Sequence, residues 1–249
     1  MDLHYEIQGQ GEPIVLLHGG GADSRAWQFV APQLAKNYQV ITFDGRGAGK
    51  SPPLLEAANF VEDLKNLLEY FNIKQAVLVG HSIGGQIATD FALAYPNRVS
   101  KLVLIAPGLS GSQPSPDVEE WFERVRKAAP DAEKMTQLAL DHPVHNVVMS
   151  SPQQELVVAI TRHNIERSFE WKTFEMLWAQ PPTIERLSEI QTKTLFIIGT
   201  EDMKDNLHTA KLFKQVPNIR FAWIDGADHT PILTHPDEVS SLILNFLSK

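Results

Sequence analysis

The chain has 249 residues, with 22 Lys+Arg against 30 Asp+Glu and a formal net charge of -8. A composition of 43% hydrophobic and 21% charged residues is typical of a globular protein, and the acidic balance without a basic run makes nucleic acid and anionic membrane surfaces unexpected partners. The chain has no cysteine, which excludes a disulfide framework, a thiolate nucleophile and a cysteine-based metal site.

The N-terminal segment contains two short strand patterns. Leu3, Tyr5 and Ile7 alternate with polar residues, residues 9–11 supply a turn, and residues 14–17 form a second apolar run, so the pattern predicts a β-hairpin. The segment lacks the basic and apolar regions of a secretion signal, and no apolar stretch of the chain is long enough to span a bilayer. A soluble cytoplasmic protein is therefore expected.

After the hairpin, short apolar runs alternate with segments of helix length. Alternating strands and helices require parallel pairing with helices on both faces of the sheet, so we expect an α/β fold with a mostly parallel, doubly wound sheet. The expected strands are Val40–Phe43, Ala76–Val79, Leu102–Ile105, Leu195–Ile198 and Phe221–Ile224, and the expected helices include Asn59–Tyr70, Gln86–Ala94 and Leu207–Lys214.

A long run of helical patterns interrupts this alternation between residues 110 and 182. From Val118 to Trp178, apolar residues recur with the spacing of amphipathic helices, and Gly, Ser and Pro are frequent at both ends of the segment. The pattern predicts a helical cap, residues 110–182, inserted into a core formed by residues 1–109 and 183–249.

The segment Gly80–Gly84 has the sequence GHSIG and lies between a strand pattern and a helix pattern. A strand that turns so sharply into a helix is strained, and glycines two positions before and after Ser82 let neighbouring backbones approach closely. The carboxyl end of a strand is where α/β sheets bind ligands, so we expect Ser82 to be an exposed nucleophile. The alternative is a turn that serves packing alone.

A serine hydroxyl needs a base that removes its proton, and nine histidines are available. His229 lies in a turn-forming segment directly after the last strand pattern, at the same edge of the sheet as Ser82. His229 is therefore the expected base, and His235, at the start of the final helix, is the second candidate. A histidine in a surface loop is the alternative interpretation.

A catalytic histidine also needs a group that fixes its tautomer and stabilises the imidazolium. Asp202 follows the strand Leu195–Ile198 at the same edge and is the expected acid. Glu201 and Asp205 remain alternatives, and the aspartates could instead cap the following helix.

A glycine-rich loop, His18–Gly21, follows the second strand pattern and has little side chain to block access. Backbone N–H groups of Gly20 and of Ile83, the residue after the serine, would form an oxyanion hole at the start of a helix. The loop lacks the spacing and the Lys-Ser/Thr ending of phosphate-binding loops, which disfavours a nucleotide.

These segments together resemble the α/β-hydrolases of the small esterase, lactonase and haloperoxidase-like group. The matching motifs, in the order of that group, are HG at 18–19, DGRGAGKS at 44–51, GHSIGG at 80–85, GTED at 199–202 and GADH at 226–229. The resemblance implies the α/β-hydrolase fold with an acyl-enzyme mechanism and no cofactor. A serine at position 82 disfavours the dehalogenases and epoxide hydrolases, which attack with aspartate. Ala48 stands where the group often has histidine.

Aromatic residues are frequent in the expected cap. Most of them should pack the cap against the core, and any that face Ser82 would line an apolar substrate pocket. Asp141–His145 contains metal-binding residue types, but an exposed turn is the favoured interpretation and no metal site is expected. The candidate pocket residues are Trp121, Phe122, Phe174 and Trp178.

The expected function is that of a serine hydrolase acting on a small carboxylic ester or lactone. Ser82 would be the nucleophile, His229 the base and Asp202 the residue that orients it. Two alternatives remain. Relatives with the same three residues hydrolyse enol-lactones or carbon-carbon bonds or form peracids, and others are ligand receptors with slow turnover.

Overall fold

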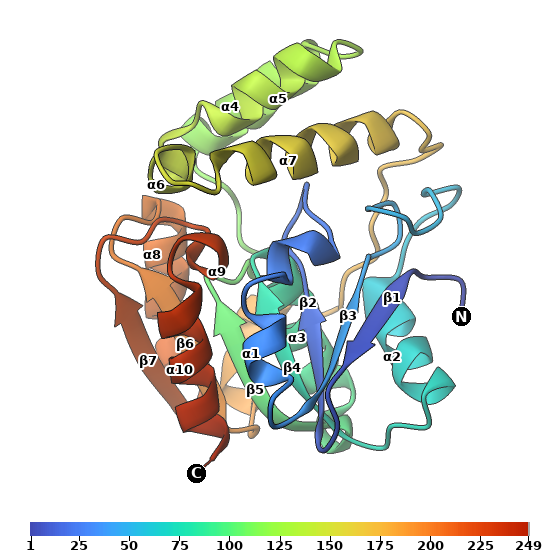
Figure 1. Cartoon of the computed structure of the whole chain (residues 1–249), viewed down its shortest axis with the longest axis vertical. Coiled ribbons are helices and arrows are strands. Elements are labelled where there is room, and N and C mark those ends of the chain that lie inside the picture. Colours follow the sequence, from blue (N-terminus) through green and yellow to red (C-terminus); the bar gives the residue numbers. More distant parts are fainter. Residues whose placement is uncertain (249) are drawn as a thin grey trace.

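A seven-stranded sheet forms the centre of the computed structural model, which describes residues 1–248 (Figure 1). The strand order is β1-β3-β2-β4-β5-β6-β7, and every neighbouring pair is parallel except β1 with β3. The mostly parallel, doubly wound α/β sheet predicted from the sequence is confirmed. The strands are β1 Tyr5–Gln8, β2 Pro13–Leu17, β3 Gln39–Phe43, β4 Ala76–His81, β5 Val99–Ile105, β6 Thr194–Gly199 and β7 Ile219–Ile224.

The predicted N-terminal hairpin is wrong, although its first strand is antiparallel as expected. β1 pairs with β3, with Tyr5 opposite Phe43, and β2 lies on the other side of β3 and runs parallel to it. The turn between β1 and β2 packs against the segment that leads into β3. A Cβ atom at Gly9 would lie 2.3 Å from the carbonyl oxygens of Ala35 and Tyr38, so this close approach requires glycine and leaves β3 between the two strands.

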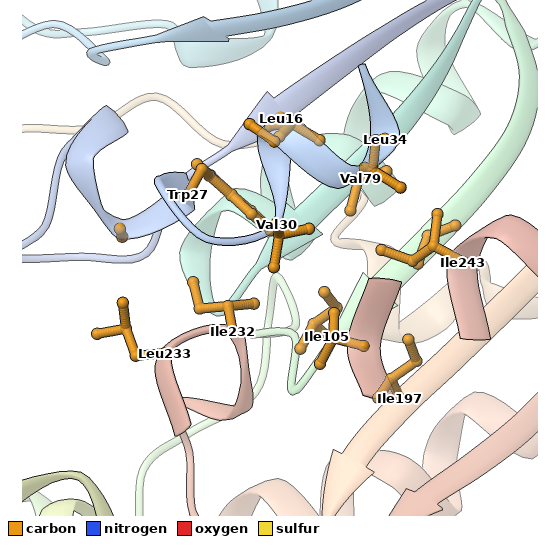
Figure 2. Packing of buried hydrophobic residues seen from close by; sticks show 14 of the residues in the cluster. Leu16, Trp27, Val30, Leu34, Val79, Ile105, Ile197, Ile232, Leu233 and Ile243 are labelled. Carbon is orange, nitrogen blue, oxygen red and sulfur yellow. The ribbon is translucent and has the colours of Figure 1, made fainter. Parts of the chain in front are cut away.

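Helices cover both faces of the sheet. Figure 2 shows part of the cluster on one face, where Leu16 and Ile105 of the sheet pack against Trp27 and Ile243. The helices packed on this face are α1 Ala31–Leu34, α9 Pro231–Thr234 and α10 Pro236–Leu247, and those on the other face are α2 Phe60–Tyr70, α3 Ile83–Ala94 and α8 Lys204–Leu212. None of the helices within residues 1–248 is both long and apolar enough to cross a membrane.

Residues 110–182 connect β5 to β6 and lie above the carboxyl ends of the parallel strands (Figure 1). The helices of this 110–182 segment are α4 Pro116–Lys127, α5 Ala132–Leu140, α6 Asn146–Met149 and α7 Gln154–Ser168. The helical pattern does not continue to Phe174 and Trp178 as expected, because this stretch is irregular and forms a single β-bridge between Met176 and Ala58. The division into core and cap at residues 110 and 183 stays a prediction.

Candidate active site

Ser82 occupies the sharp turn between β4 and α3. Its φ of +53° and ψ of -121° lie in a region that residues with a side chain rarely adopt, so the backbone is strained at this position. The turn depends on the flanking glycines, because a Cβ at Gly80 would lie 2.3 Å from the Gly84 oxygen and a Cβ at Gly84 would lie 2.3 Å from the Leu17 oxygen. The strained turn leaves the Ser82 side chain in the wall of a cavity.

The structure brings Ser82, His229 and Asp202 together from three separate strand ends. His229 Nε2 lies 3.0 Å from Ser82 Oγ, and His229 Nδ1 lies 3.3 Å from Asp202 Oδ2. The carboxylate of Asp202 is fully buried, whereas 13% of the imidazole is exposed. The three side chains thus form a continuous chain from a buried carboxylate to an accessible hydroxyl.

The other candidates for base and acid lie elsewhere. His235 Nδ1 contacts the hydroxyl of its neighbour Thr234, and Glu201 is exposed. Asp205 Oδ2 accepts a hydrogen bond from the backbone N–H of Ser115 at 2.8 Å, so it links α8 to the start of the 110–182 segment. None of the three contacts Ser82 or His229 through a hydrogen bond within residues 1–248.

Burial and charge act in opposite directions on the pair Asp202 and His229. Burial alone would raise the pKa of Asp202, but the nearby His229 and hydrogen bonds from Asn206 and the Met203 N–H outweigh it and lower that pKa. Burial alone would lower the pKa of His229, but the Asp202 carboxylate outweighs burial and raises the pKa above its ordinary value. The pair therefore stabilises the imidazolium form of His229.

Asn206 is a buried member of the site that the sequence interpretation missed. Its Nδ2 donates to Asp202 Oδ1 at 2.7 Å and lies 2.9 Å from His229 Nδ1. Asp202 Oδ1 also accepts the N–H of Met203 at 2.8 Å. The signal in the sequence was its spacing, because a polar residue four positions after Asp202 lies in the first turn of α8, directly after the loop that carries Asp202.

His81 joins the serine turn to the loop that carries His229. Its Nε2 lies 2.7 Å from the backbone oxygen of His229, and burial lowers the pKa of His81 to about 3. A neutral ring with its proton on Nε2 therefore donates this hydrogen bond. The contact fixes the backbone of His229 relative to Ser82.

The glycine-rich loop lies directly beside the serine turn. A Cβ at Gly19 would lie 3.3 Å from the Cβ of Ser82, and a Cβ at Gly20 would lie 3.8 Å from the side chain of Ile83. The N–H of Ile83 is the first of α3, so it has no carbonyl partner within its own helix. The structure thus places the loop and this N–H on the two sides of Ser82.

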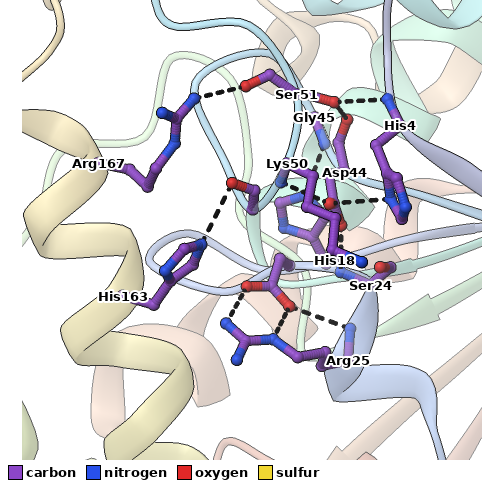
Figure 3. A network of polar contacts seen from close by, with 12 residues as sticks. His4, His18, Ser24, Arg25, Asp44, Gly45, Lys50, Ser51, His163 and Arg167 are labelled. Carbon is purple, nitrogen blue, oxygen red and sulfur yellow. Dashed lines mark hydrogen bonds and ion pairs between the residues drawn. The ribbon is translucent and has the colours of Figure 1, made fainter.

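A polar network joins the loop at residues 44–51 to α7 (Figure 3). Asn164 is buried, its Oδ1 accepts the Gly49 N–H at 2.8 Å, and its Nδ2 donates to Asp23 Oδ2 at 2.8 Å. Arg167 donates to the Ser51 oxygen at 2.7 Å. These bonds attach the C-terminal half of α7 to the loops around the carboxyl edge of the sheet.

A second contact joins the 110–182 segment to the histidine loop. The N–H of Val148, in α6, donates to Asp228 Oδ2 at 2.9 Å. Asp228 is fully buried, and its Oδ1 accepts both the N–H and the hydroxyl of Thr230 at 3.0 Å. The residue that precedes His229 is therefore held from both sides.

Two cavities meet at the glycine-rich loop. One, of about 500 Å³ including its open part, is lined by Ser82 and His229 together with apolar side chains such as Val157 and Ile160 of α7. The other, of about 780 Å³ including its open part, extends from Ile83 to an aromatic and apolar wall. We call them the histidine-side cavity and the isoleucine-side cavity. The wall of the second contains Phe60, Ile87, Trp171 and Met176.

The four aromatic residues predicted for the substrate pocket line neither cavity. Trp121 stacks on His142 with ring centroids 4.2 Å apart, and Trp178 packs against Phe60 at 6.1 Å. Phe122 and Phe174 are 45% and 68% exposed. The sequence located the aromatic residues of the segment, but it could not show which way each ring points.

The sheet is mostly parallel, and a serine lies on a strained turn between a strand and a helix. A histidine and an aspartate lie on the loops after two later strands. This combination defines a hydrolase of the α/β-hydrolase class. Residues 12–236 match the alpha/beta hydrolase fold family, and the chain belongs to it.

Relatives of known name include a 2-hydroxy-6-oxo-6-phenylhexa-2,4-dienoate hydrolase of Burkholderia cepacia. The aligned region, 267 residues long, is 32% identical and covers 99% of this chain and 91% of that protein. Among solved structures, MenH from S. aureus has a TM-score of 0.83 at 24% identity over 98% of both chains. The enol-lactonase from Burkholderia xenovorans has a TM-score of 0.77 at 20% identity, over 99% of this chain and 96% of that one. The two solved structures show the fold alone.

Proposed function

We propose that this protein is a serine hydrolase that cleaves small, neutral carboxylic esters or lactones through an acyl-enzyme. The observation that carries the proposal is the continuous chain from Asp202 through His229 to Ser82 at a cavity wall, with contacts of 3.3 and 3.0 Å. This arrangement activates a hydroxyl for attack on a carbonyl carbon.

In the first half of the reaction, Ser82 Oγ bonds to the carbonyl carbon and its proton moves to His229 Nε2. The negative charge that develops on the carbonyl oxygen is stabilised by the N–H groups of Ile83 and Gly20. The tetrahedral intermediate then collapses, the bond to the leaving oxygen breaks, and His229 gives its proton to that oxygen. Asp202 stabilises the imidazolium throughout.

In the second half, water replaces the alcohol. His229 removes a proton from the water, the hydroxide oxygen bonds to the acyl carbon, and the same N–H groups stabilise the second oxyanion. Collapse returns the proton to Ser82 Oγ and releases the carboxylic acid. For a lactone, the acid and the alcohol are released as one hydroxy acid.

The positions of the cavities indicate how a substrate would bind. Because His229 gives its proton to the leaving oxygen, the alcohol portion must lie in the histidine-side cavity. The acyl portion then extends past Ile83 into the isoleucine-side cavity, whose wall of Phe60, Trp171 and Met176 favours an apolar chain or ring.

The charges that line the cavities favour a neutral substrate. Within residues 1–248, Arg46 is the sole lysine or arginine lining either cavity, and it forms ion pairs with Asp2 at 2.9 Å and Asp63 at 2.8 Å. Burial lowers the pKa of His145, in the histidine-side cavity, to about 3, so this side chain is neutral. No unpaired cation in the described part of the chain is placed to bind a carboxylate of the substrate.

Carbon-carbon bond hydrolysis is the second candidate, because the curated relative from Burkholderia cepacia is named for a dienoate substrate. The same serine and histidine would serve that reaction. A dienoate carries a carboxylate, and Arg46 could bind it only after giving up an ion pair with Asp2 or Asp63. The ester and lactone proposal therefore ranks first.

The two candidates are separated by a substrate panel. We expect sustained multiple turnover of p-nitrophenyl acetate and of simple lactones, and a much lower kcat/KM for 2-hydroxy-6-oxo-dienoates. Ser82→Ala should lower kcat by at least about four orders of magnitude, whereas the exposed Ser188→Ala should not change it. Normal turnover by Ser82→Ala would refute the proposal. A single stoichiometric burst would support a receptor, and preference for the dienoate would support the second candidate.

The assignment of the cavities has its own test. Met176→Trp should narrow the isoleucine-side cavity and lower kcat/KM for long acyl chains while sparing acetate esters of any alcohol. Val157→Phe should instead lower kcat/KM for bulky alcohols while sparing long acyl chains on a small alcohol. The opposite pattern would show that the acyl and alcohol portions are exchanged.

A further inference from the structure

The polar side chains that line the isoleucine-side cavity are all bonded within the protein. His18 is bonded through both ring nitrogens, at 2.8 and 2.9 Å, to backbone groups of the neighbouring loops. Arg46 pairs with Asp63, both amide atoms of Asn164 are bonded, and so is the ring N–H of Trp171. This cavity therefore offers a substrate apolar contact but no free side-chain donor or acceptor.

The histidine-side cavity differs in this respect. Apart from the proposed nucleophile and base, its polar side chains are His81, Thr230, His145 and Thr161. His81 bonds to the backbone oxygen of the base, and Thr230 bonds to the neighbouring Asp228. His145 and Thr161 form no side-chain hydrogen bond with any group in residues 1–248. Both come from the 110–182 segment, so this segment supplies the free polar groups of the cavity.

Thr161, in α7, has an available hydroxyl. Thr89 and Thr136 also lie in helices, and each donates to the carbonyl oxygen four residues earlier at 2.7 Å. Thr161 does not form the equivalent bond, and its hydroxyl is not buried among other atoms. A group in the cavity can therefore use it as donor and as acceptor.

His145 closes the short turn Pro143–His145 that precedes α6. Its Nδ1 is buried without a partner, whereas its Nε2 is not buried. Because the ring lines the histidine-side cavity, Nε2 is the atom through which it can bond there. Burial lowers the pKa of His145 to about 3, so the ring stays neutral, and Nε2 donates or accepts according to the tautomer.

The position of His145 is fixed without a hydrogen bond from its own side chain. Its ring packs edge-on against Trp121, with centroids 6.0 Å apart. Three residues later, the N–H of Val148 donates to Asp228, which directly precedes His229. These contacts hold the ring close to the proposed base and leave Nε2 for a ligand.

We propose that His145 and Thr161 are specificity-determining residues that bind a free hydroxyl group on the alcohol portion of the substrate. The preferred substrates are then monoesters of neutral diols or triols rather than esters of simple alkanols. A hydroxyl group suits both residues because it donates and accepts, and neither residue carries a charge that would attract an ion. The proposal rests on the proposed function, because the alcohol portion occupies this cavity only if His229 protonates the leaving oxygen.

Two esters of the same shape test the proposal. 2-Hydroxyethyl butanoate and propyl butanoate differ by a hydroxyl in place of a methyl group, and the ratio of their kcat/KM values is divided by the ratio of their uncatalysed hydrolysis rates. We expect the wild type to prefer the hydroxyethyl ester by about tenfold, the effect of one or two neutral hydrogen bonds. Equal values for the two esters would overturn the proposal.

Variants assign the preference to the two residues. Thr161→Val exchanges the hydroxyl for a methyl group, and His145→Phe keeps a flat ring without nitrogen. Each should lower the preference to about threefold, and the double variant should abolish it. Neither should lower kcat/KM for propyl butanoate. Thr136→Val, the same exchange in α5 and outside both cavities, should keep the full preference.

Three results of the variant series would contradict the proposal. One is a preference that survives in the double variant, and another is an equal loss of kcat/KM for both esters, which would show a merely structural role. The third is a preference for methyl 6-hydroxyhexanoate over methyl heptanoate that Thr161→Val removes, because the acyl portion would then occupy this cavity. If His145→Phe does not fold, Thr161→Val decides alone, since it changes no shape.

The same assays separate this proposal from the proposed function. If the wild type hydrolyses neither butanoate ester, the proposed function fails and this proposal fails with it. If it hydrolyses both esters equally well and Ser82→Ala hydrolyses neither, the proposed function stands and the binding of a hydroxyl group by His145 and Thr161 is refuted.

Discussion

Replacing Asn164 by alanine removes the buried bonds that attach α7 to the core. The side chain is 6% exposed and bridges the Gly49 N–H to the Asp23 carboxylate, with both distances at 2.8 Å. After the substitution, the buried Gly49 N–H has no partner. Asp23 keeps its hydrogen bonds and ion pair with Arg25, the latter at 2.6 Å, but loses the bond from Asn164.

The expected loss follows from these two groups. An unsatisfied buried N–H costs about 1–3 kcal/mol, and a lost hydrogen bond to a charged group costs about 1.5–3 kcal/mol. Because Asp23 keeps Arg25, we take the lower half of each range and expect about 3 kcal/mol in the free energy of unfolding. For a chain of this size, that corresponds to a Tm lower by about 6–12 °C.

Urea denaturation followed by circular dichroism, together with a thermal scan, measures this loss. Asn146→Ala is the matched control, since Asn146 is exposed in α6 of the same segment. We expect the control to stay within about 0.5 kcal/mol of the wild type. If Asn164→Ala also stays within that range, the buried bridge does not contribute to stability and the reasoning is refuted.

Three further predictions concern buried titratable groups. The raised pKa of His229 implies that kcat/KM falls as the pH drops through a value above 6.5, and an acid limb below 6.5 would contradict it. Burial raises the pKa of Asp90 from 3.8 to about 6, so the free energy of unfolding should decline as the pH rises through that window. Asp90→Asn should lack this decline. In urea denaturation at pH 8, the variant should be more stable than the wild type by up to about 3 kcal/mol. His81→Phe removes the bond to the His229 oxygen, so kcat should fall about tenfold with KM unchanged in steady-state assays.

The fold and the meeting of the three candidate residues could be predicted because both depend on short local patterns. Ser82, Asp202 and His229 each follow a short strand, and the carboxyl ends of parallel strands lie at one edge of a sheet. Their proximity therefore follows from topology. Which of Glu201, Asp202 and Asp205 faces the histidine depends on how the loop turns into α8, and the sequence favoured Asp202 without excluding the others.

The parts that the sequence missed depend on contacts between distant segments. The pairing of β1 with β3 follows from the approach of Gly9 to residues 35–38, which no local pattern indicates. The direction of the Trp121 ring is set by its stacking on His142. Trp171 is held in the wall of the isoleucine-side cavity by a hydrogen bond from its ring nitrogen to the Gly47 oxygen at 3.1 Å. Such pairings appear only when the chain is folded.

Two buried contacts of the 110–182 segment also limit how this protein could be recombined with its relatives. Asp23 and Asp228 are buried carboxylates of the surrounding chain, and each accepts a hydrogen bond from the segment, from Asn164 and from the Val148 N–H. A chimera that received the corresponding segment of another hydrolase would bury two anions without these donors, unless the graft supplied them. Exchange of substrate specificity by segment swapping would therefore require matched donors at both positions, and natural variants of the segment should change together with Asp23 and Asp228.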